Sequence, residues 1–313
     1  MKLVSFRQQN IAKPGLFTKK GIIDITLNWP DSNPPRSVKQ ILIRGDKCLE
    51  TLALIEKNCD NFLNENSVKL LAPIPNPPKI LALAGNYTKH IIEAGLKLGL
   101  SDSPAKTTVP RPFIMPGSAI NHPESTIPWP TYSKDIDYEI ELAIIIGKTA
   151  KNITPSETLD YIAGYTVAND ISARSVTFKQ ARAERPWDEF YDWLNGKWAD
   201  GFLPIGPCIV TKDEIPDVQN LELTLKVNGQ VRQNANTSSM IHSVAEIVSF
   251  ISNLMTLQPG DIIATGTPEG VGMADGRFLE PGDNIECEIE KIGTLKNSLS
   301  QRPENFYQPL KAH

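Results

Sequence analysis

The stretch "DYEIELAIIIGK", residues 137–148, decides the fold and raises a problem of charge. From Tyr138 to Ile146 it is mostly Ile, Leu and Ala, which predicts a β-strand. Glu139 and Glu141 are two residues apart, so their side chains point to the same face of that strand. Two carboxylates this close repel each other and resist burial. Either this is an edge strand with a wet outer face, or both carboxylates bind one divalent cation.

A third carboxylate favours the cation. Asp170 ends the apolar strand "YTVAND", 29 residues after Glu141. An Asp at this place could instead cap the turn that follows. Mg²⁺, Mn²⁺ and Ca²⁺ take several oxygen ligands, and carboxylates from two neighbouring strands can reach one ion. The sequence therefore predicts a metal site made of Glu139, Glu141 and Asp170.

The segment between these two strands is predicted to contain a short crossover helix. Thr154 is its N-cap, Pro155 takes the first helical position, and Glu157 completes a capping box. Gly164 is expected to close the helix. One helix and a turn are enough to bring the two strands side by side.

Composition excludes several classes of protein. The 313 residues are 40% hydrophobic and 22% charged, which suits one large domain, alone or with a small one. The net charge is -4 and no run is rich in Lys or Arg, so nucleic acid and anionic membranes are poor candidate partners. The four cysteines are scattered, which indicates buried or idle thiols. The start "MKLVSFRQQN" has no apolar signal region, and no stretch approaches the ~18 apolar residues of a membrane span. We therefore expect a soluble cytoplasmic protein.

Residues 1–72 are expected to form a small β-rich N-terminal domain. "GIIDITL" (21–27) and "QILIRG" (40–45) are predicted strands, and "LALIEKNCDNFLNE" (52–65) has helical spacing. The run "APIPNPPK" (72–79) is the predicted linker, because its prolines exclude a helix or a central strand.

A large domain is expected over residues 79–300, followed by a tail over 301–313. "KILALAG" is a predicted buried strand that ends at Gly85, and a helix is predicted over 86–99. "LELTLKVNGQVRQ" alternates apolar residues ahead of an Asn-Gly pair, which is typical of a hairpin. The amphipathic helix "HSVAEIVSFISNLMTL" begins with a second capping box. Strands predominate over helices, so the predicted fold class is α+β.

A His and a Glu share one face of the helix predicted after Gly85. His90 and Glu93 are i and i+3 and are therefore neighbours. A carboxylate beside an imidazole fixes its tautomer and raises its basicity, which is what a general base for water needs. The alternative is a surface salt bridge. The chain has four His, and the other three have no obvious carboxylate partner on a helix face.

Two further stretches could carry chemistry. In "NGKWADGFLPIGP", Lys197 stands among Gly, Trp and Phe, where a partly apolar site would let its charge stabilise a developing oxyanion or carbanion. A solvated lysine is the alternative. The loop "ATGTPEGVG", residues 264–272, lacks the Lys-Ser/Thr of a phosphate-binding P-loop and no helix is predicted after it. Its backbone N–H groups and the Thr267 hydroxyl could bind a carboxylate.

Together these stretches resemble the fumarylacetoacetate hydrolase family. The matching pieces run in the family's order over about residues 79–297, and the leading "MKLVSFR" resembles the family's small N-terminal domain. The pieces are "KILALAGNYTKHIIEAG", "DYEIELAIIIGK", "IAGYTVANDISARS", "GKWADGFLPIGP", "LKVNGQVRQNANTSSMI", "IVSFISNLMTLQPGDIIATGTPEGVG" and "LEPGDNIECEIEKIGTLKN".

The resemblance implies a mixed β-sandwich roll, assembled as a homodimer, that holds Mg²⁺ or Mn²⁺, with Ca²⁺ as a third option. It implies that the metal ligands are Glu139, Glu141 and Asp170. It assigns the water-activating pair to His90 and Glu93 on a lid-like segment, and charge stabilisation to Lys197. The residues that it implies for substrate binding are Tyr87, Arg174 and Thr267.

Two departures from the family pattern concern the substrate pocket. Many members have a Gln seven residues after the metal-binding Asp, and this chain has Thr177 there. The chain also carries a long aromatic and charged stretch, "FKQARAERPWDEFYDWL", over residues 178–194. Both differences bear on which substrate is recognised.

We therefore expect a metal-dependent enzyme that acts on a small 2-oxo or β-keto dicarboxylic acid of the acylpyruvate type. It would cleave a C–C bond by hydrolysis or decarboxylation through an enolate stabilised by the metal. Isomerisation of a 2-hydroxy-dienedioate and a ureidoglycolate-type lyase reaction are alternatives within the family. A non-catalytic module that binds metal and small carboxylates, and a nucleotide-binding protein built around "GTPEGVG", are alternatives from other classes.

Overall fold

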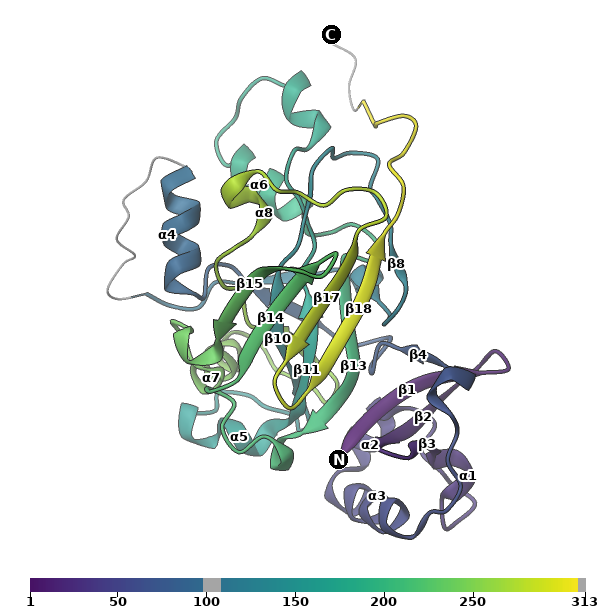
Figure 1. Cartoon of the computed structure of the whole chain (residues 1–313). Helices are drawn as coiled ribbons and strands as arrows, with labels where there is room; N and C mark the ends of the chain where they lie inside the picture. Colours follow the sequence, from purple (N-terminus) through teal and green to yellow (C-terminus); the bar gives the residue numbers. More distant parts are fainter. Residues whose placement is uncertain (98–107, 309–313) are drawn as a thin grey trace.

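In the part of the chain that the structure describes, the main sheet has eleven strands and continues from the N-terminal segment into the rest of the molecule (Figure 1). The computed structural model describes residues 1–97 and 108–308. The strands follow the order β3-β2-β1-β13-β11-β10-β16-β5-β6, with β4 on β1 and β7 on β13. Their bounds are β1 Lys2–Gln8, β2 Ile11–Thr18, β3 Gly21–Asp24, β4 Lys69–Leu71, β5 Ile80–Leu83, β6 Pro112–Met115, β7 Ile120–Asn121, β10 Ile140–Ile146, β11 Ile162–Asn169, β13 Leu203–Thr211 and β16 Ile262–Ala264.

A second sheet of five strands, in the order β15-β14-β17-β18-β8, packs on the first. In Figure 1 its long strands β14, β17 and β18 pass in front of β10, β11 and β13. Leu142 and Val167 of the first sheet share one buried cluster with Leu225 and Ile285 of the second. This is the predicted sandwich of the α+β class. The bounds are β8 Thr126–Ile127, β14 Glu222–Val227, β15 Gln230–Asn236, β17 Asn284–Ile289 and β18 Gly293–Leu299, and a separate pair joins β9 Ile136–Asp137 to β12 Ser172–Ala173.

Helices fill the ends and the outer faces of the sheets. They are α1 Ile25–Asn28, α2 Val38–Arg44, α3 Asp46–Asn58, α4 Thr88–Lys97, α5 Thr158–Tyr161, α6 Asp188–Asn195, α7 Val244–Leu254 and α8 Gly272–Asp275. Short 3-10 turns are η1 Glu65–Ser67, η2 Gly117–Ala119, η3 Pro155–Glu157, η4 Thr177–Ala181, η5 Lys212–Glu214 and η6 Thr237–Ser239. None of the helices described is long and apolar enough to cross a membrane.

Several local predictions are confirmed. Both capping boxes form, at Thr154 before η3 and at Ser243 before α7. The hairpin β14–β15 turns at Asn228 and Gly229, both with positive φ (50° and 78°), as an Asn-Gly turn requires. The proline-rich run over 72–79 forms neither helix nor strand. All four cysteines are free thiols, and three of them are buried.

The predicted strand "QILIRG" is wrong, because these residues belong to helix α2. The Ser37 side chain accepts a hydrogen bond from the Gln40 N–H and starts the helix, and Gly45 (φ 69°) ends it. Val38, Ile41 and Leu42 then lie on one buried face, the i, i+3, i+4 spacing of a helix. Similarly, only the first half of "GIIDITL" is strand, and helix α1 takes the second half.

Two smaller predictions are also corrected. Gly164 does not close the crossover helix, which ends at Tyr161; it lies inside β11, where a Cβ would come within 2.1 Å of the Val210 carbonyl oxygen on β13. The Gly-rich loop over 264–272 is followed by a helix after all, the single turn α8.

The N-terminal residues continue the main sheet. Strand β1 pairs antiparallel with β13, with Lys2 opposite Val210 and Leu3 opposite Ile209. One apolar cluster runs from Ile41 on α2 to Ile145 on β10. The division into domains at 1–72 and 79–300 stays a prediction, as does the tail at 301–313, of which residues 309–313 lie outside the described part of the chain. The last two residues of the helix predicted over 86–99 also lie outside it.

Candidate metal centre and active site

Strands β10 and β11 bring the three predicted carboxylates together. They pair antiparallel, with Ile140 opposite Asn169, so Asp170 emerges beside the start of β10. Its N–H donates to the Glu139 carbonyl oxygen at 2.9 Å. One ligand oxygen from each of Glu139, Glu141 and Asp170 lies within 4.8 Å of the other two, and all three residues are buried. The edge-strand alternative is wrong, because β10 lies between β11 and β16 and is buried along its whole length.

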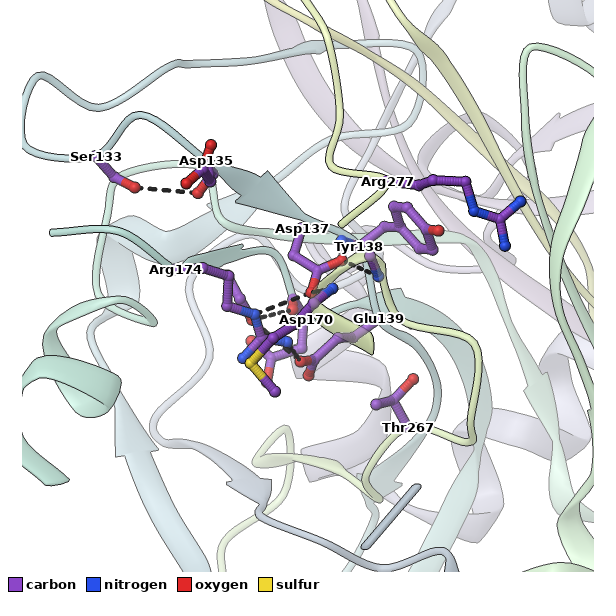
Figure 2. Close-up of polar contacts among 12 residues, drawn as sticks. Ser133, Asp135, Asp137, Tyr138, Glu139, Asp170, Arg174, Thr267 and Arg277 are labelled. Carbon is purple, nitrogen blue, oxygen red and sulfur yellow. Dashed lines mark hydrogen bonds and ion pairs between the residues drawn. The ribbon is translucent and has the colours of Figure 1, made fainter. Parts of the chain in front are cut away.

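Two cations compensate part of this negative charge. The Lys197 ammonium, 2% exposed, donates to Glu139 Oε2 and to Asp170 Oδ2, both at 2.7 Å. The Arg174 guanidinium donates to Glu139 Oε1 and, at 2.9 Å, to Asp137 Oδ2 (Figure 2). The alternative of a solvated Lys197 is therefore wrong. Gly196 makes this position reachable, since a Cβ there would lie 2.4 Å from the Ala173 carbonyl oxygen.

Because Lys197 and Arg174 act unequally on the three carboxylates, the pKa values of these groups differ. Burial by itself would raise the pKa of Glu139, but Lys197 and Arg174 outweigh burial and lower that pKa to about 2. Burial raises the pKa of Asp170 to about 6; the Lys197 ammonium opposes this rise and the Glu139 charge adds to it. Burial, followed by the charges of Asp170 and Glu139, raises the pKa of Glu141 well above its ordinary range. The Lys197 and Arg174 charges thus keep Glu139 anionic, whereas burial favours the neutral forms of Glu141 and Asp170, and a further cation would favour their charged forms.

Unused oxygens show that the residues fit such a cation. Glu141 Oε2 accepts the Gly266 N–H at 2.8 Å, but Glu141 Oε1 and Asp170 Oδ1 are buried without a hydrogen-bond partner in the structure. Buried carboxylate oxygens are costly to leave unpaired. A set of carboxylate oxygens without N or S donors suits Mg²⁺, Mn²⁺ or Ca²⁺. These residues would therefore hold one hard divalent ion.

Helix α4 carries His90 to the cavity beside the triad. His90 and Glu93 share one face, as predicted, but His90 Nδ1 and Glu93 Oε2 are 3.8 Å apart, too far for a hydrogen bond. Glu93 instead accepts the Gly270 N–H at 3.1 Å, and the ammonium of Lys89 lies 3.2 Å from Glu269. The Glu93 contact attaches α4 to the Gly-rich loop, and the exposed Lys89 pair contributes little to this attachment. The roles of His90 and Glu93 in activating water stay predictions.

The sequence did not single out Gln233, which fixes the Gly-rich loop against β10. Its amide Nε2 donates to Thr267 Oγ1 and to the Pro268 carbonyl oxygen, both at 2.9 Å, while its Oε1 accepts the Ile140 N–H at 3.0 Å. A signal was present, because Gln233 pairs with Leu225 in the apolar row of the predicted hairpin. A polar side chain in such a row needs buried partners.

The sequence analysis also did not single out Asp137 as a site residue. Its Oδ1 accepts N–H groups from Tyr138 (2.9 Å) and Gly272 (2.6 Å), and its Oδ2 accepts the Met273 N–H at 3.0 Å. With Arg174 as the fourth donor, Asp137 joins β9 to the start of α8 (Figure 2). Asp137 precedes Glu139 by two residues. The two-residue spacing of Glu139 and Glu141 in the sequence therefore extends back to Asp137.

A cavity of 490 Å³ opens over this cluster. Its polar end is formed by His90, Glu139, Arg174, Lys197 and Thr267. Its remaining walls are largely apolar, and they include residues of the 178–194 stretch. The other lining residues are Leu83, Ala84, Gly85, Phe113, Ser172, Ala173, Val176, Lys179, Glu189, Phe190, Asp192, Trp193 and Met273.

Two residues expected to shape the pocket do not line it. Thr177 donates its hydroxyl to the Tyr307 carbonyl oxygen at 2.6 Å. Tyr87 is fully buried, and its hydroxyl has no hydrogen-bond partner in the structure. Its role in substrate binding stays a prediction, as do those of Arg174 and Thr267, which do reach the cavity.

Comparison with known proteins gives this geometry a context. Residues 79–300 match the family model for the fumarylacetoacetate hydrolase C-terminal domain. A mitochondrial oxaloacetate tautomerase of Xenopus laevis is 36% identical over 303 residues, covering 96% of this chain and 90% of that protein.

Two solved structures share the fold over nearly the whole chain. Maleylpyruvate hydrolase from Sphingobium sp. SYK-6, in complex with manganese(II) and pyruvate, has a TM-score of 0.75 and 30% identity, covering 97% of this chain and 100% of that one. The 5-carboxymethyl-2-hydroxymuconate delta-isomerase from Mycobacterium smegmatis has a TM-score of 0.72 and 30% identity, covering 96% and 100%. With its motifs, its sandwich and its carboxylate triad, the chain belongs to the fumarylacetoacetate hydrolase family.

Proposed function

We propose that this protein is a divalent-metal-dependent enzyme that hydrolyses a C–C bond in an acylpyruvate. One observation carries the proposal: the buried triad, with two unpartnered carboxylate oxygens, lies at the polar end of a cavity that also presents Arg174, Lys197 and His90. An anionic 2-oxo acid matches this end, because its carboxylate and oxo oxygens suit a metal and cationic side chains.

Each group at the polar end has a place in the reaction. A divalent ion held by Glu139, Glu141 and Asp170 supplies a Lewis acid for the 2-oxo-carboxylate end. Lys197 places a buried positive charge where an enolate oxygen develops. Its two carboxylate contacts also fix its position before the substrate arrives. Arg174, held by Asp137, orients the anionic end.

The bond changes assign two proton transfers to His90. The imidazole takes a proton from water, and the water oxygen bonds to the acyl carbon. The bond from that carbon to the methylene carbon then breaks, and its electron pair leaves as the enolate of pyruvate. His90 returns its proton to the methylene carbon, so the products are a carboxylic acid and pyruvate.

Two of the named relatives support a 2-oxo acid as substrate or product. Maleylpyruvate hydrolase, with manganese and pyruvate bound, supports C–C hydrolysis and a divalent ion. The size of the cavity supports a substrate with an acyl tail, since 490 Å³ falls in the range that buries drug-sized ligands and exceeds the needs of a four-carbon acid.

Keto–enol tautomerisation of oxaloacetate is the second candidate. The relative that supports it aligns with 96% of this chain. The geometry is compatible, because tautomerisation needs the same enolate and the same proton carrier but no attacking water. The long distance between His90 and Glu93 also leaves the imidazole without the partner that water activation requires in this conformation.

Product analysis separates the two candidates. The protein is incubated with acetylpyruvate or with oxaloacetate, with Mg²⁺, with Mn²⁺ and after chelation. Pyruvate is measured by coupling to lactate dehydrogenase, and oxaloacetate enol by its ultraviolet absorbance. Hydrolysis predicts metal-dependent release of pyruvate from acetylpyruvate. If neither metal leads to release of pyruvate and the enol signal of oxaloacetate decays rapidly, the proposed reaction is tautomerisation and not hydrolysis.

Metal binding is expected to stabilise the fold, and more so at higher pH. At about one hundred times its dissociation constant, the ion should add roughly 2.7 kcal/mol to the free energy of unfolding. Folding raises the Asp170 pKa from 3.8 to about 6, so the folded metal-free protein holds this proton more tightly than the unfolded chain. Metal-free stability therefore falls as pH rises through this interval. The ion binds the deprotonated ligands, so its stabilisation should grow across the same interval.

Thermal melts at pH 5 and pH 7.5, with Mn²⁺ or with chelator, measure this effect. Glu139→Gln should shrink the gain from metal, since it removes a ligand charge. Glu157→Gln is a matched control, because that exposed carboxylate only caps η3. An equal gain from metal in the wild type and in Glu139→Gln would contradict the assigned ligands.

The expected homodimer and the cytoplasmic location remain predictions. Light scattering on the purified protein tests the first, and imaging of the tagged protein in its own cells tests the second.

A further inference from the structure

The stretch 178–194, which departs from the family pattern, forms one wall of the cavity. It contains most of η4 and most of helix α6, and five of its residues line the cavity: Lys179, Glu189, Phe190, Asp192 and Trp193. A substrate held by Arg174 and Lys197 would share the cavity with this wall.

An ion-pair clamp holds the wall in place. Arg182 makes a bidentate contact with Asp192, at 2.7 and 2.8 Å, and a third bond to Asp188 Oδ2 at 3.0 Å. Asp188 also accepts hydrogen bonds from the Arg185 backbone N–H, at 2.9 Å, and from the Arg185 guanidinium, at 3.0 Å. Asp188 and Asp192 are i and i+4 on α6 and both are buried. Bidentate Arg–carboxylate contacts fix orientation, so the clamp determines which face of α6 meets the cavity.

Two of the four α6 residues that line the cavity, Phe190 and Trp193, are aromatic. Trp193 packs edge-on against Phe113 of β6, with ring centroids 4.9 Å apart, and Phe190 lies 5.9 Å from Trp193. Phe190 is 51% exposed although it lines the cavity. The three rings therefore offer apolar surface to a ligand, and aromatic faces and edges favour flat partners.

Charge at this end is balanced. Among the described lining residues, Asp192 is already paired with Arg182, and Lys179 and Glu189 supply one charge of each sign. A second carboxylate would therefore meet no net positive charge at this end. A neutral planar group would gain apolar contact without losing hydration of a charge.

We infer that the 178–194 wall selects acylpyruvates whose acyl tail is a neutral planar group, such as an aryl or conjugated alkenyl ketone. This inference rests on the proposed function and narrows its substrate class. Trp193 and Phe190 are the specificity-determining residues, and Arg182 is a positioning residue that acts through α6.

The test compares two substrates that differ only in the tail, benzoylpyruvate and acetylpyruvate. We expect the wild type to have the higher kcat/KM for benzoylpyruvate. Trp193→Ala should lower the ratio of the two kcat/KM values by about 10- to 100-fold, the range for lost contact in an apolar pocket. Phe190→Ala should lower the same ratio; because this ring is half exposed, the variant is expected to fold. Trp187→Ala is the control, since Trp187 belongs to the same stretch, does not line this cavity and should leave the ratio unchanged.

Arg182→Gln tests the positioning role. It should lower the ratio as the aromatic variants do, while the kcat for acetylpyruvate changes far less than the ratio. A wild type that prefers acetylpyruvate, or a ratio that both aromatic variants leave unchanged, would overturn the inference. If neither substrate is turned over, the proposed function fails, and calorimetric binding then decides this inference separately. Benzoylpyruvate must bind more tightly than acetylpyruvate in the wild type, and Phe190→Ala must remove that difference.

Discussion

Replacing His90 with Ala is expected to lower kcat on the best acylpyruvate by ~10²–10⁴-fold, the usual loss when a general base is removed. The imidazole lines the cavity and is not a ligand of the metal site, so metal affinity should barely change. Steady-state kinetics and a metal titration of the same sample measure the two effects. Lys89→Ala, one residue earlier on α4, is the matched control, since its exposed ion pair with Glu269 contributes little.

The double mutant with Glu93→Gln shows whether the two residues act together. If Glu93 orients the imidazole during the reaction, the two losses should not add. In the structure Glu93 accepts the Gly270 N–H instead, so the Glu93 or His90 side chain must rotate for the pair to form a hydrogen bond. Wild-type turnover in the double mutant would mean that His90 does not carry the proton, and that the metal and Lys197 suffice.

Lys197→Met should damage both stability and catalysis. The substitution keeps most of the buried volume but leaves Glu139 and Asp170 without the ammonium that contacts both. Removing one partner from a buried ion pair costs about 3–5 kcal/mol, so the metal-free variant should unfold at a much lower urea concentration. The lost positive charge at the developing enolate should lower kcat by ~10²–10³-fold.

Saturating Mn²⁺ separates these two effects. The ion should restore much of the stability, because it brings positive charge to the same carboxylates, but it should not restore turnover. Lys148→Met is a suitable control, as the pair of Lys148 with Asp46 is exposed and should contribute about 1 kcal/mol or less. Full activity in metal-loaded Lys197→Met would rule out a role for the ammonium in the reaction.

The carboxylate triad was predictable because the sequence places its parts in regular relation. The two-residue alternation put Glu139 and Glu141 on one face, and a helix that begins at a capping box returned the chain to place Asp170 beside them. The α+β class followed from the predicted strands, and the sandwich was implied by the resemblance to the family. These features depend on short-range periodicity, which local sequence records.

Contacts between distant segments were not predictable in this way. Lys197 lies 58 residues from Glu139 along the chain, and their ion pair depends on the close approach of Gly196 to β12. Gln233 meets Thr267 only because the second sheet packs on the first. The helix at 38–44 was missed for a local reason, since its short apolar run fits a strand as well as a helix until the Ser37 cap is considered.

The position of Lys197 also bears on the order in which the chain folds and binds a metal ion. Because one ammonium already contacts two of the three carboxylates, we expect the polypeptide to complete its fold before any ion arrives. The metal ion would then bind to a site that has already folded, and it would exchange with ions in solution. Oxygen-only ligands discriminate weakly between hard divalent ions, so the supply in the cell would set the occupant.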